Sequence, residues 1–195
     1  MELSDIQKDL KNSLSSKRFH HSAGVAQTAA HLAEKYGADR EKAYLAGWVH
    51  DCAKEMTLPK MQELAKKGGI TGDIPLLSSR ALLHGPAGSI LIETKYGIKD
   101  EEIKSAVYYH TTGHINMTLL EKIIFLADYI EPSRDFPGVN TLRHLAEKNL
   151  DEALLAAYDS TISHLLEQKA YIYNLTFMGR NDLILKRKEN TNEKK

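Results

Sequence analysis

Apolar residues recur at intervals of three and four along most of the chain, which is the spacing of amphipathic α-helices. The first such segment places Ile6, Leu10 and Leu14 on one side, and Ser4 with Gln7 predicts a capping box at its start. Glycines and prolines after later apolar segments mark helix ends. We therefore expect this opening helix and further helices over residues 17–36, 40–53, 57–68, 85–96, 101–110, 119–130, 141–149 and 151–170.

The remaining segments are predicted to be connections. Residues 70–79 are rich in Gly, Ser and Pro and predict a loop, while residues 131–140 predict a turn. Residues 171–177 are ambiguous between helix and strand. No internal repeat or long linker divides the chain. We expect an all-α fold with one domain over residues 1–185 and a frayed polar C-terminal tail over residues 186–195.

Composition narrows the class of protein. The chain has 195 residues, of which 42% are hydrophobic and 27% charged, the balance of one globular domain. A single cysteine excludes an intramolecular disulfide, and the N-terminus lacks the apolar segment of a signal peptide, so we expect a cytoplasmic protein without a membrane span. Lys+Arg and Asp+Glu both total 26, which gives no basic field for a nucleic acid.

The pair His50-Asp51 is the strongest candidate for chemistry. Imidazole nitrogen and carboxylate oxygen together suit a divalent metal such as zinc, iron or manganese. Lys54 follows one helical turn later, so its ammonium is expected over the same surface. A metal with a neighbouring cation is the combination that a phosphate substrate needs. Cys52 lies beside the pair, but we expect it to serve packing.

Four further residues fall at or near predicted helix ends or core faces. His21 lies on the helix over residues 17–36, and His84 stands just before Gly85-Pro86 at an expected helix entrance. His110 ends its predicted helix. Asp128 has almost only apolar neighbours in sequence, where a carboxylate is costly to bury unless it is paired or bound to metal.

Five short motifs resemble the HD superfamily of metal-dependent phosphohydrolases, whose helical bundle carries a His…His-Asp…Asp pattern. They are closest to the YqeK branch, the symmetrical diadenosine-tetraphosphate hydrolases of bacteria. The five motifs keep their order along most of the chain. They cover residues 17–26 (Lys-Arg-Phe-His-His-Ser-Ala-Gly-Val-Ala), 47–54 (Gly-Trp-Val-His-Asp-Cys-Ala-Lys), 83–88 (Leu-His-Gly-Pro-Ala-Gly), 109–113 (Tyr-His-Thr-Thr-Gly) and 126–134 (Leu-Ala-Asp-Tyr-Ile-Glu-Pro-Ser-Arg).

The resemblance implies a binuclear metal site. His21, His50, Asp51 and Asp128 would hold one metal, and His84 and His110 would complete a second site with Asp51 bridging the two. Asp51 and Lys54 would serve catalysis, and the phosphates of the substrate would contact Lys54, Arg134 and His114. His114 departs from the family pattern, which has an arginine there in many relatives; an imidazole can still donate to phosphate, but its charge depends on pH.

Simpler interpretations stay open for several of these residues. His84 and His110 could cap their helices, and Lys54 and Arg134 could be solvated surface residues. His20, His31, His144 and His164 are expected to be structural. No phosphate-binding glycine-rich motif of the nucleotide-binding folds is present in the sequence.

By the resemblance, the expected reaction is the symmetrical cleavage of diadenosine tetraphosphate into two ADP by a metal-activated water. The expected cofactor is a metal pair, iron or alternatively manganese. The alternatives are a 5′-nucleotidase or other nucleotide phosphohydrolase of the superfamily, or a non-enzymatic nucleotide-sensing module with a structural metal. The expected partner is a small nucleotide, with no nucleic acid and no membrane, and a homodimer is an option for the assembly.

Overall fold

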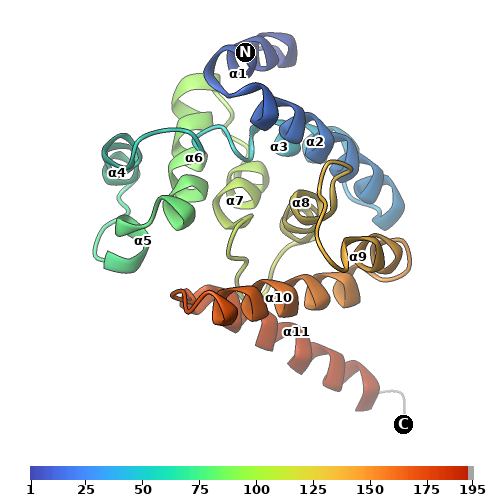
Figure 1. The fold of residues 1–195 in the computed structure, drawn as a ribbon. Helices are drawn as coiled ribbons and strands as arrows, with labels where there is room; N and C mark the ends of the chain where they lie inside the picture. The colour runs from blue at the N-terminus through green and yellow to red at the C-terminus, as the bar shows by residue number, and fades with distance from the viewer. Residues whose placement is uncertain (193–195) are drawn as a thin grey trace.

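The computed structural model describes residues 1–192, with side chains up to residue 188, and this part of the chain is all-α, as predicted. Its helices are connected by short loops and turns (Figure 1). They are α1 (Leu3–Ser13), α2 (Ser16–Tyr36), α3 (Arg40–Val49), α4 (Leu58–Lys67), α5 (Ile74–Ser78), α6 (Arg80–Tyr96), α7 (Glu101–Tyr109), α8 (Leu119–Ile130), α9 (Val139–Ala146), α10 (Leu150–Glu167) and α11 (Asn174–Asn192).

The centre of the bundle is formed by α2, α3, α7 and α8, which pack on one another. Helix α6 packs on the outer side of α7 and carries α4 and α5, while α9 and α10 cover α8 from the other side (Figure 1). Helices α2 and α3 lie in close contact at Gly47, where a Cβ would lie 2.5 Å from the Cα of Ala26. Gly47 therefore brings the end of α3, and the His-Asp pair after it, against α2.

Two apolar clusters stabilise this arrangement. The larger one runs through α1, α2, α3, α7, α8 and α10 and includes Ile6, Val49, Ile124 and Tyr158. The smaller one joins α4, α5 and α6, and Tyr173 from the segment before α11 packs into it.

Several helix boundaries differ from the prediction. Helix α1 begins after Glu2 without a side-chain cap, so the capping box of Ser4 and Gln7 was wrong. The predicted loop over residues 70–79 contains the short helix α5, which the side chain of Asp73 caps. Helix α6 begins after Ser79 because the Ser79 hydroxyl accepts a hydrogen bond from the amide of Leu82. His84 therefore lies inside α6, not at its entrance, and Pro86 is accommodated within the helix.

Other boundaries agree with the prediction. Helices α7 and α8 begin where expected: Asp100 caps α7, as Asp39 caps α3, and Thr118 with Glu121 forms a capping box at the start of α8. Helix α3, however, ends at Val49, and the chain continues through tight turns in which the amide of Lys54 donates to the carbonyl of Asp51 at 2.9 Å. The His-Asp pair thus lies just beyond the helix instead of in its last turn.

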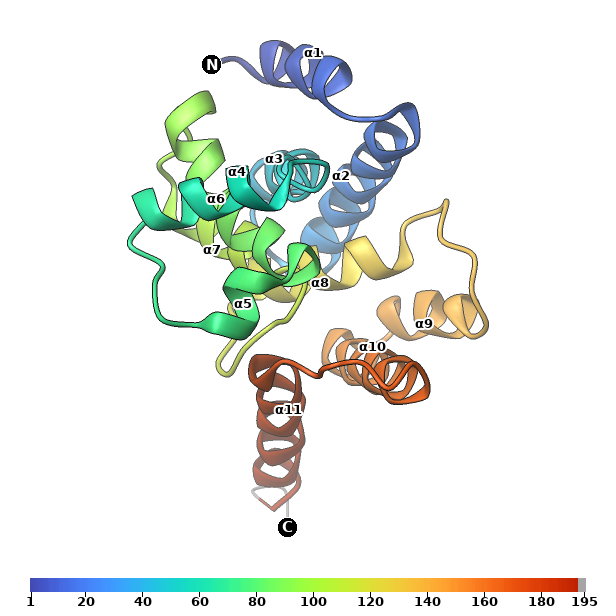
Figure 2. The same cartoon turned by 60° about the vertical axis from the view of Figure 1, so that its left-hand side comes forward.

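Helix α11 was not predicted. It packs on α10 and extends away from the bundle (Figure 2), and it continues through residue 192, so residues 186–192 of the expected frayed tail are helical. The rest of that tail, residues 193–195, lies outside the described residues. Among the described residues, no helix combines the length and apolar character needed to cross a lipid bilayer.

Candidate metal centre

Six side chains that are far apart in the sequence meet at the centre of the bundle. Four contribute an imidazole and two a carboxylate. Five of the six residues are buried, and the Asp128 side chain is 21% exposed because it faces a cavity. They are His21 on α2, His50 and Asp51 after α3, His84 on α6, His110 after α7, and Asp128 on α8. The structure therefore brings together all six residues that the sequence singled out as ligands.

The two carboxylate oxygens of Asp51 face opposite halves of this cluster. Oδ2 lies 3.5 Å from Nε2 of His50 and 3.8 Å from Nε2 of His21. Oδ1 lies 3.2 Å from Nε2 of His84 and 3.5 Å from Nε2 of His110. Asp128 belongs to the first half, since its Oδ1 lies 2.9 Å from Nε2 of His21. Two groups that follow these halves, His21 with His50 and Asp51, and Asp51 with His84 and His110, have the spacing of metal ligands, and so does a third group that spans them, His50 with His110 and Asp128.

The tautomers of the histidines follow from their Nδ1 contacts. Carbonyl and carboxylate oxygens only accept hydrogen bonds, so an Nδ1 that faces one carries the proton and leaves a lone pair on Nε2. The four Nδ1 partners are Gly47 O for His50 at 2.7 Å, Val107 O for His110 at 2.7 Å, Arg80 O for His84 at 3.3 Å and Glu131 Oε1 for His21 at 2.9 Å. In their neutral forms, His50, His84 and His110 thus direct an Nε2 lone pair into the cluster, while Nε2 of His21 faces Oδ1 of Asp128 at 2.9 Å.

Such an arrangement of lone pairs fits a cation. The Nε2 atoms of His84 and His110 lie 2.9 Å apart, where two lone pairs repel each other. Nε2 of His50 and Oδ1 of Asp51 are buried and have no hydrogen-bond partner. Buried polar atoms are rarely left unpaired. A donor set of imidazole nitrogen and carboxylate oxygen suits first-row transition metals, so the residues present fit a metal site.

Both carboxylates are held ionised. Burial raises the pKa of Asp51, but the imidazoles of His50, His110 and His84, in their protonated forms, lower it by more, so that it lies well below the ordinary value. The pKa of Asp128 also lies well below its ordinary value, because burial raises it but His21, His50 and Arg134 together lower it by more. An ionised carboxylate is the form that ligates a metal.

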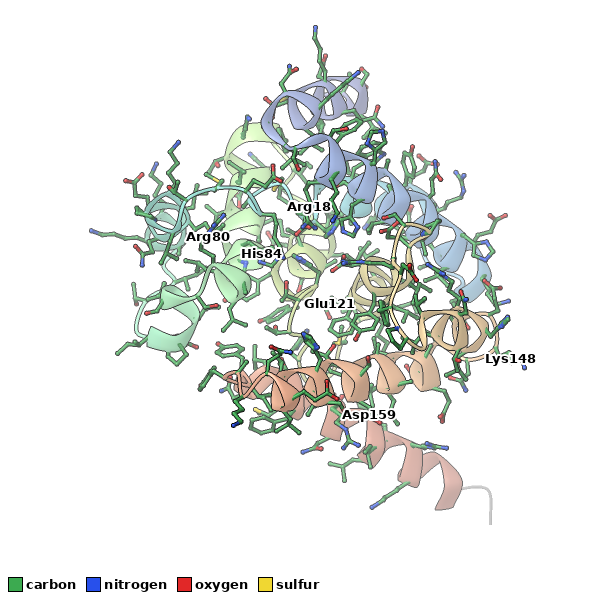
Figure 3. All side chains as sticks on the ribbon, viewed as in Figure 1. Arg18, Arg80, His84, Glu121, Lys148 and Asp159 are labelled. Atoms are coloured by element: carbon green, nitrogen blue, oxygen red, sulfur yellow. The ribbon has the colours of Figure 1, made fainter. Side chains whose placement is uncertain are left out.

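Three further residues contact the cluster, and none of them had a predicted role. Arg18 donates to Oδ2 of Asp51 at 2.6 Å, and Figure 3 places both Arg18 and His84 near the centre of the bundle. Glu131 orients His21 through its Nδ1. The hydroxyl of Thr111 lies 3.1 Å from Nε2 of both His84 and His110. All three belong to the five motifs, but their contacts arise only from the packing of separate helices.

A cavity of about 680 Å³ opens beside the cluster. Its inner end is lined by Lys54, His110, Asp128 and Arg134. Nζ of Lys54 lies 3.1 Å from Nε2 of His84, and Nη2 of Arg134 lies 2.5 Å from Oδ1 of Asp128. Two basic side chains thus line the cavity next to the cluster, and their charge favours an anionic ligand there.

His114 is not brought to the cluster. Its Nε2 lies 3.0 Å from Oε2 of the buried Glu121, and its ring packs on Tyr109 with 4.0 Å between ring centroids. It does not line the cavity. Cys52 is buried in the larger apolar cluster, and burial raises the pKa of its thiol, in agreement with the expected packing role.

Comparisons with known proteins agree with this geometry. The family model of the HD domain matches residues 18–133. A protein of Halalkalibacterium halodurans named "Bis(5'-nucleosyl)-tetraphosphatase, symmetrical" is 43% identical over 179 residues, which cover 92% of this chain and 95% of the relative. A protein of the same name from Bacillus subtilis is 39% identical over 175 residues, which cover 90% of this chain and 94% of the relative.

A solved structure shares the fold as well as the sequence. A crystal structure from Clostridium acetobutylicum, described as a predicted HD superfamily hydrolase involved in NAD metabolism, has a TM-score of 0.93 and 43% sequence identity. The similarity covers 95% of this chain and 98% of the other. The bundle, the converging His and Asp side chains and these similarities together lead to one conclusion: the chain belongs to the HD-domain family.

Proposed function

We propose that this protein is a metal-dependent hydrolase that cleaves diadenosine tetraphosphate symmetrically into two ADP. The names of the Halalkalibacterium halodurans and Bacillus subtilis relatives support the reaction, since each is similar to this chain over at least 90% of its length. The observation that carries the proposal within the structure is the position of Asp51. One carboxylate whose two oxygens face two groups of histidine nitrogens is the arrangement expected between a pair of metal ions.

We assign His21, His50 and Asp128 to one ion, His84 and His110 to the other, and Asp51 to both. Iron is the metal we expect, with manganese as the alternative, because both accept mixed imidazole and carboxylate ligands. When bound, such a metal pair supplies Lewis-acid polarisation of phosphate oxygens and an activated water at neutral pH.

The residues of the chain supply the remaining requirements. The ammonium of Lys54 and the guanidinium of Arg134 line the cavity beside the ligands and are placed to neutralise and orient a polyphosphate. Glu131 and the three backbone carbonyls keep the imidazoles in the tautomer that presents Nε2. Hydrolysis between the two central phosphates releases ADP, which leaves as a phosphate anion and needs less help from a general acid than an alkoxide does.

Hydrolysis in oxygen-18 water tests the position of cleavage. The symmetrical reaction gives ADP as the sole nucleotide product, with one label per substrate molecule cleaved. Equal amounts of ATP and AMP would reject symmetrical cleavage and leave a general metal phosphohydrolase. Release of inorganic phosphate from nucleoside monophosphates, without cleavage of the tetraphosphate, would favour the 5′-nucleotidase instead.

A purely structural metal is the competing class of function. A structural metal site is closed, whereas the present cluster borders a cavity that is lined by the basic side chains of Lys54 and Arg134. Metal removal separates the two: loss of folding without turnover of any nucleotide would support the structural role. The cytoplasmic location and the homodimer stay predictions, which cell fractionation and light scattering of the purified protein would test.

A further inference from the structure

The cavity beside the metal centre extends well beyond the cluster of ligands. Its outer part is lined by the second half of α10, from which Ser160, Ser163, His164 and Glu167 face it. These positions follow the helical spacing of three and four residues, so they form one continuous polar stripe. The same helix carries Leu154, Ala157 and Tyr158 in the core. Helix α10 is therefore both a structural element and one wall of the cavity.

An aromatic pair forms the neighbouring wall. The rings of Tyr129, at the end of α8, and Phe136, in the loop before α9, meet edge to face, with 5.2 Å between centroids and 79° between planes. Both residues are only half-buried and both line the cavity. A half-buried aromatic ring in the wall of a cavity accepts another planar ring by stacking or edge-to-face contact.

Charge divides the cavity into two ends. Lys54 and Arg134 lie at the end near the metal ligands, whereas the α10 wall contributes no lysine or arginine and carries the carboxylate of Glu167. A phosphate is attracted to the first end and repelled from the second. The second end instead suits an uncharged group that has a planar face, hydrogen-bonding edges and hydroxyl donors. The volume of about 680 Å³ is that of a pocket for a complete small molecule.

We propose that Tyr129 and Phe136 together with Ser160, Ser163 and His164, here called the nucleoside wall, bind one nucleoside of the substrate. The base stacks on the aromatic pair, and the hydroxyl and imidazole groups of α10 contact the base edge and the ribose. The polyphosphate then runs from the nucleoside wall to Lys54 and Arg134. This assignment rests on the proposed function for the identity of the ligand, and it makes α10 a determinant of nucleotide specificity outside the matched HD-domain segment.

Isothermal titration of the manganese-loaded protein with ADP and, separately, with inorganic pyrophosphate tests the nucleoside wall. Both probes carry a diphosphate, but only ADP carries a nucleoside. Phe136→Leu removes the ring, and Phe177→Leu, an exposed phenylalanine on α11 outside the cavity, is the matched control. We expect Phe136→Leu to weaken ADP binding about tenfold, the scale of one lost stacking contact, and to change pyrophosphate binding less than twofold. Phe177→Leu should change neither.

A second pair of variants does not depend on an aromatic residue of the loop. His164 is exposed on α10, so His164→Gln should fold normally, and His144→Gln on α9 is its control outside the cavity. We expect His164→Gln to weaken ADP binding several-fold and His144→Gln to leave it unchanged. Equal losses for ADP and pyrophosphate in both wall variants, or unchanged ADP binding in both, would overturn the nucleoside wall.

The same proteins separate this inference from the proposed function. If no dinucleoside polyphosphate is hydrolysed but ADP binding still depends selectively on Phe136 and His164, the proposed reaction fails and the nucleoside wall stands. If diadenosine tetraphosphate is cleaved symmetrically while the wall variants bind ADP as the unaltered protein does, the reaction stands and the nucleoside wall is rejected.

Discussion

Nδ1 of His21 and Oε1 of Glu131 lie 2.9 Å apart although the two residues are separated by 110 positions in the sequence. The same carboxylate accepts hydrogen bonds from the amide and the hydroxyl of Ser133. Arg143 holds the backbone around it by donating to the carbonyls of Ile130 and Glu131. Glu131 therefore links the orientation of His21, a proposed metal ligand on α2, to the loop that follows α8.

This link predicts the effect of removing the carboxylate. Glu131→Ala leaves Nδ1 of a buried histidine without its acceptor, so we expect a 10- to 100-fold loss of metal affinity, the usual scale for an outer partner of a ligating histidine. Glu147→Ala is the matched control, because Glu147 pairs with His31 at the same 2.9 Å but on the surface. Metal affinity measured by competition with a chelator checks the prediction. Equal affinities of the two variants would contradict the orienting role.

The close contact between Gly24 and Glu131 leads to a prediction about stability. A Cβ at this position would lie 2.5 Å from Oε2 of Glu131, and that carboxylate is fixed by its own hydrogen bonds. We expect Gly24→Ala to lower the free energy of unfolding by about 1–3 kcal/mol, as overpacking does. Urea unfolding of the single and double variants checks the cause: the cost of Gly24→Ala should shrink when Glu131 is also alanine. An unchanged cost in the double variant would mean that the strain lies elsewhere.

The convergence of the proposed ligands could be anticipated from the sequence because residue types and local motifs single them out. His50 and Asp51 are adjacent, and Asp128 is conspicuous among apolar neighbours. The roles of Arg18 and Glu131 could not be predicted in the same way, because each depends on a contact between segments that only the packed bundle brings together. The contact of His114 with Glu121 could not be predicted either, because Glu121 is buried by tertiary packing, which the local sequence does not reveal.

The fold shows the same division. Helices that begin with a strong capping signal, such as α8 at Thr118, were placed correctly. Helix α6 was predicted to start near Pro86, because proline favours the first turn of a helix, but the cap at Ser79 starts it earlier. Helix α11 has a weak apolar pattern and forms against α10, where Leu183 joins the main core. Tertiary packing decides whether segments with a weak apolar pattern form helices.

We expect substitutions of Asp51 and His84 to cause different extents of metal loss. The oxygens of Asp51 face both groups of histidines, whereas His84 belongs to one group. Asp51→Asn should therefore lose both metals and reduce turnover at least about 100-fold beyond His84→Ala, which should keep one metal. Elemental analysis of both purified variants, together with turnover at saturating metal, measures this. Similar metal content and mild losses in both would reject the bridging role.

Glu121 predicts a pH-dependent contribution to stability. Burial raises the pKa of Glu121, but hydrogen bonds from His114 and Ser105 lower it further, so the folded pKa lies below the ordinary value of 4.5. The stabilisation is present above pH 4.5 and is lost as pH falls through the folded pKa. We expect Glu121→Gln to cost about 2 kcal/mol at pH 7 and less at pH 4. Urea unfolding at both values, with Glu63→Gln as an exposed control, checks it; a deficit that grows toward pH 4 would contradict the sign.

Arg134 predicts a defect in substrate binding. Its guanidinium lines the cavity and is held by two hydrogen bonds to Asp128, one to the carbonyl at 2.7 Å and one to Oδ1 at 2.5 Å. A group fixed in this way loses little entropy when it binds a phosphate, so its removal should cost the full charge-assisted contact, about 1.5–3 kcal/mol. We expect Arg134→Gln to raise the KM for diadenosine tetraphosphate about 10- to 100-fold, with the increase larger in low salt than in high salt because a charge interaction is lost. Arg40→Gln, on the exposed surface of α3, is the matched control and should not change KM at either salt concentration.

Because Asp128 is also a proposed ligand, the metal content of Arg134→Gln is measured in parallel. A normal metal content with a raised KM supports a direct contact between Arg134 and the polyphosphate. Loss of metal with an unchanged KM in the remaining active fraction would assign Arg134 to the metal centre alone.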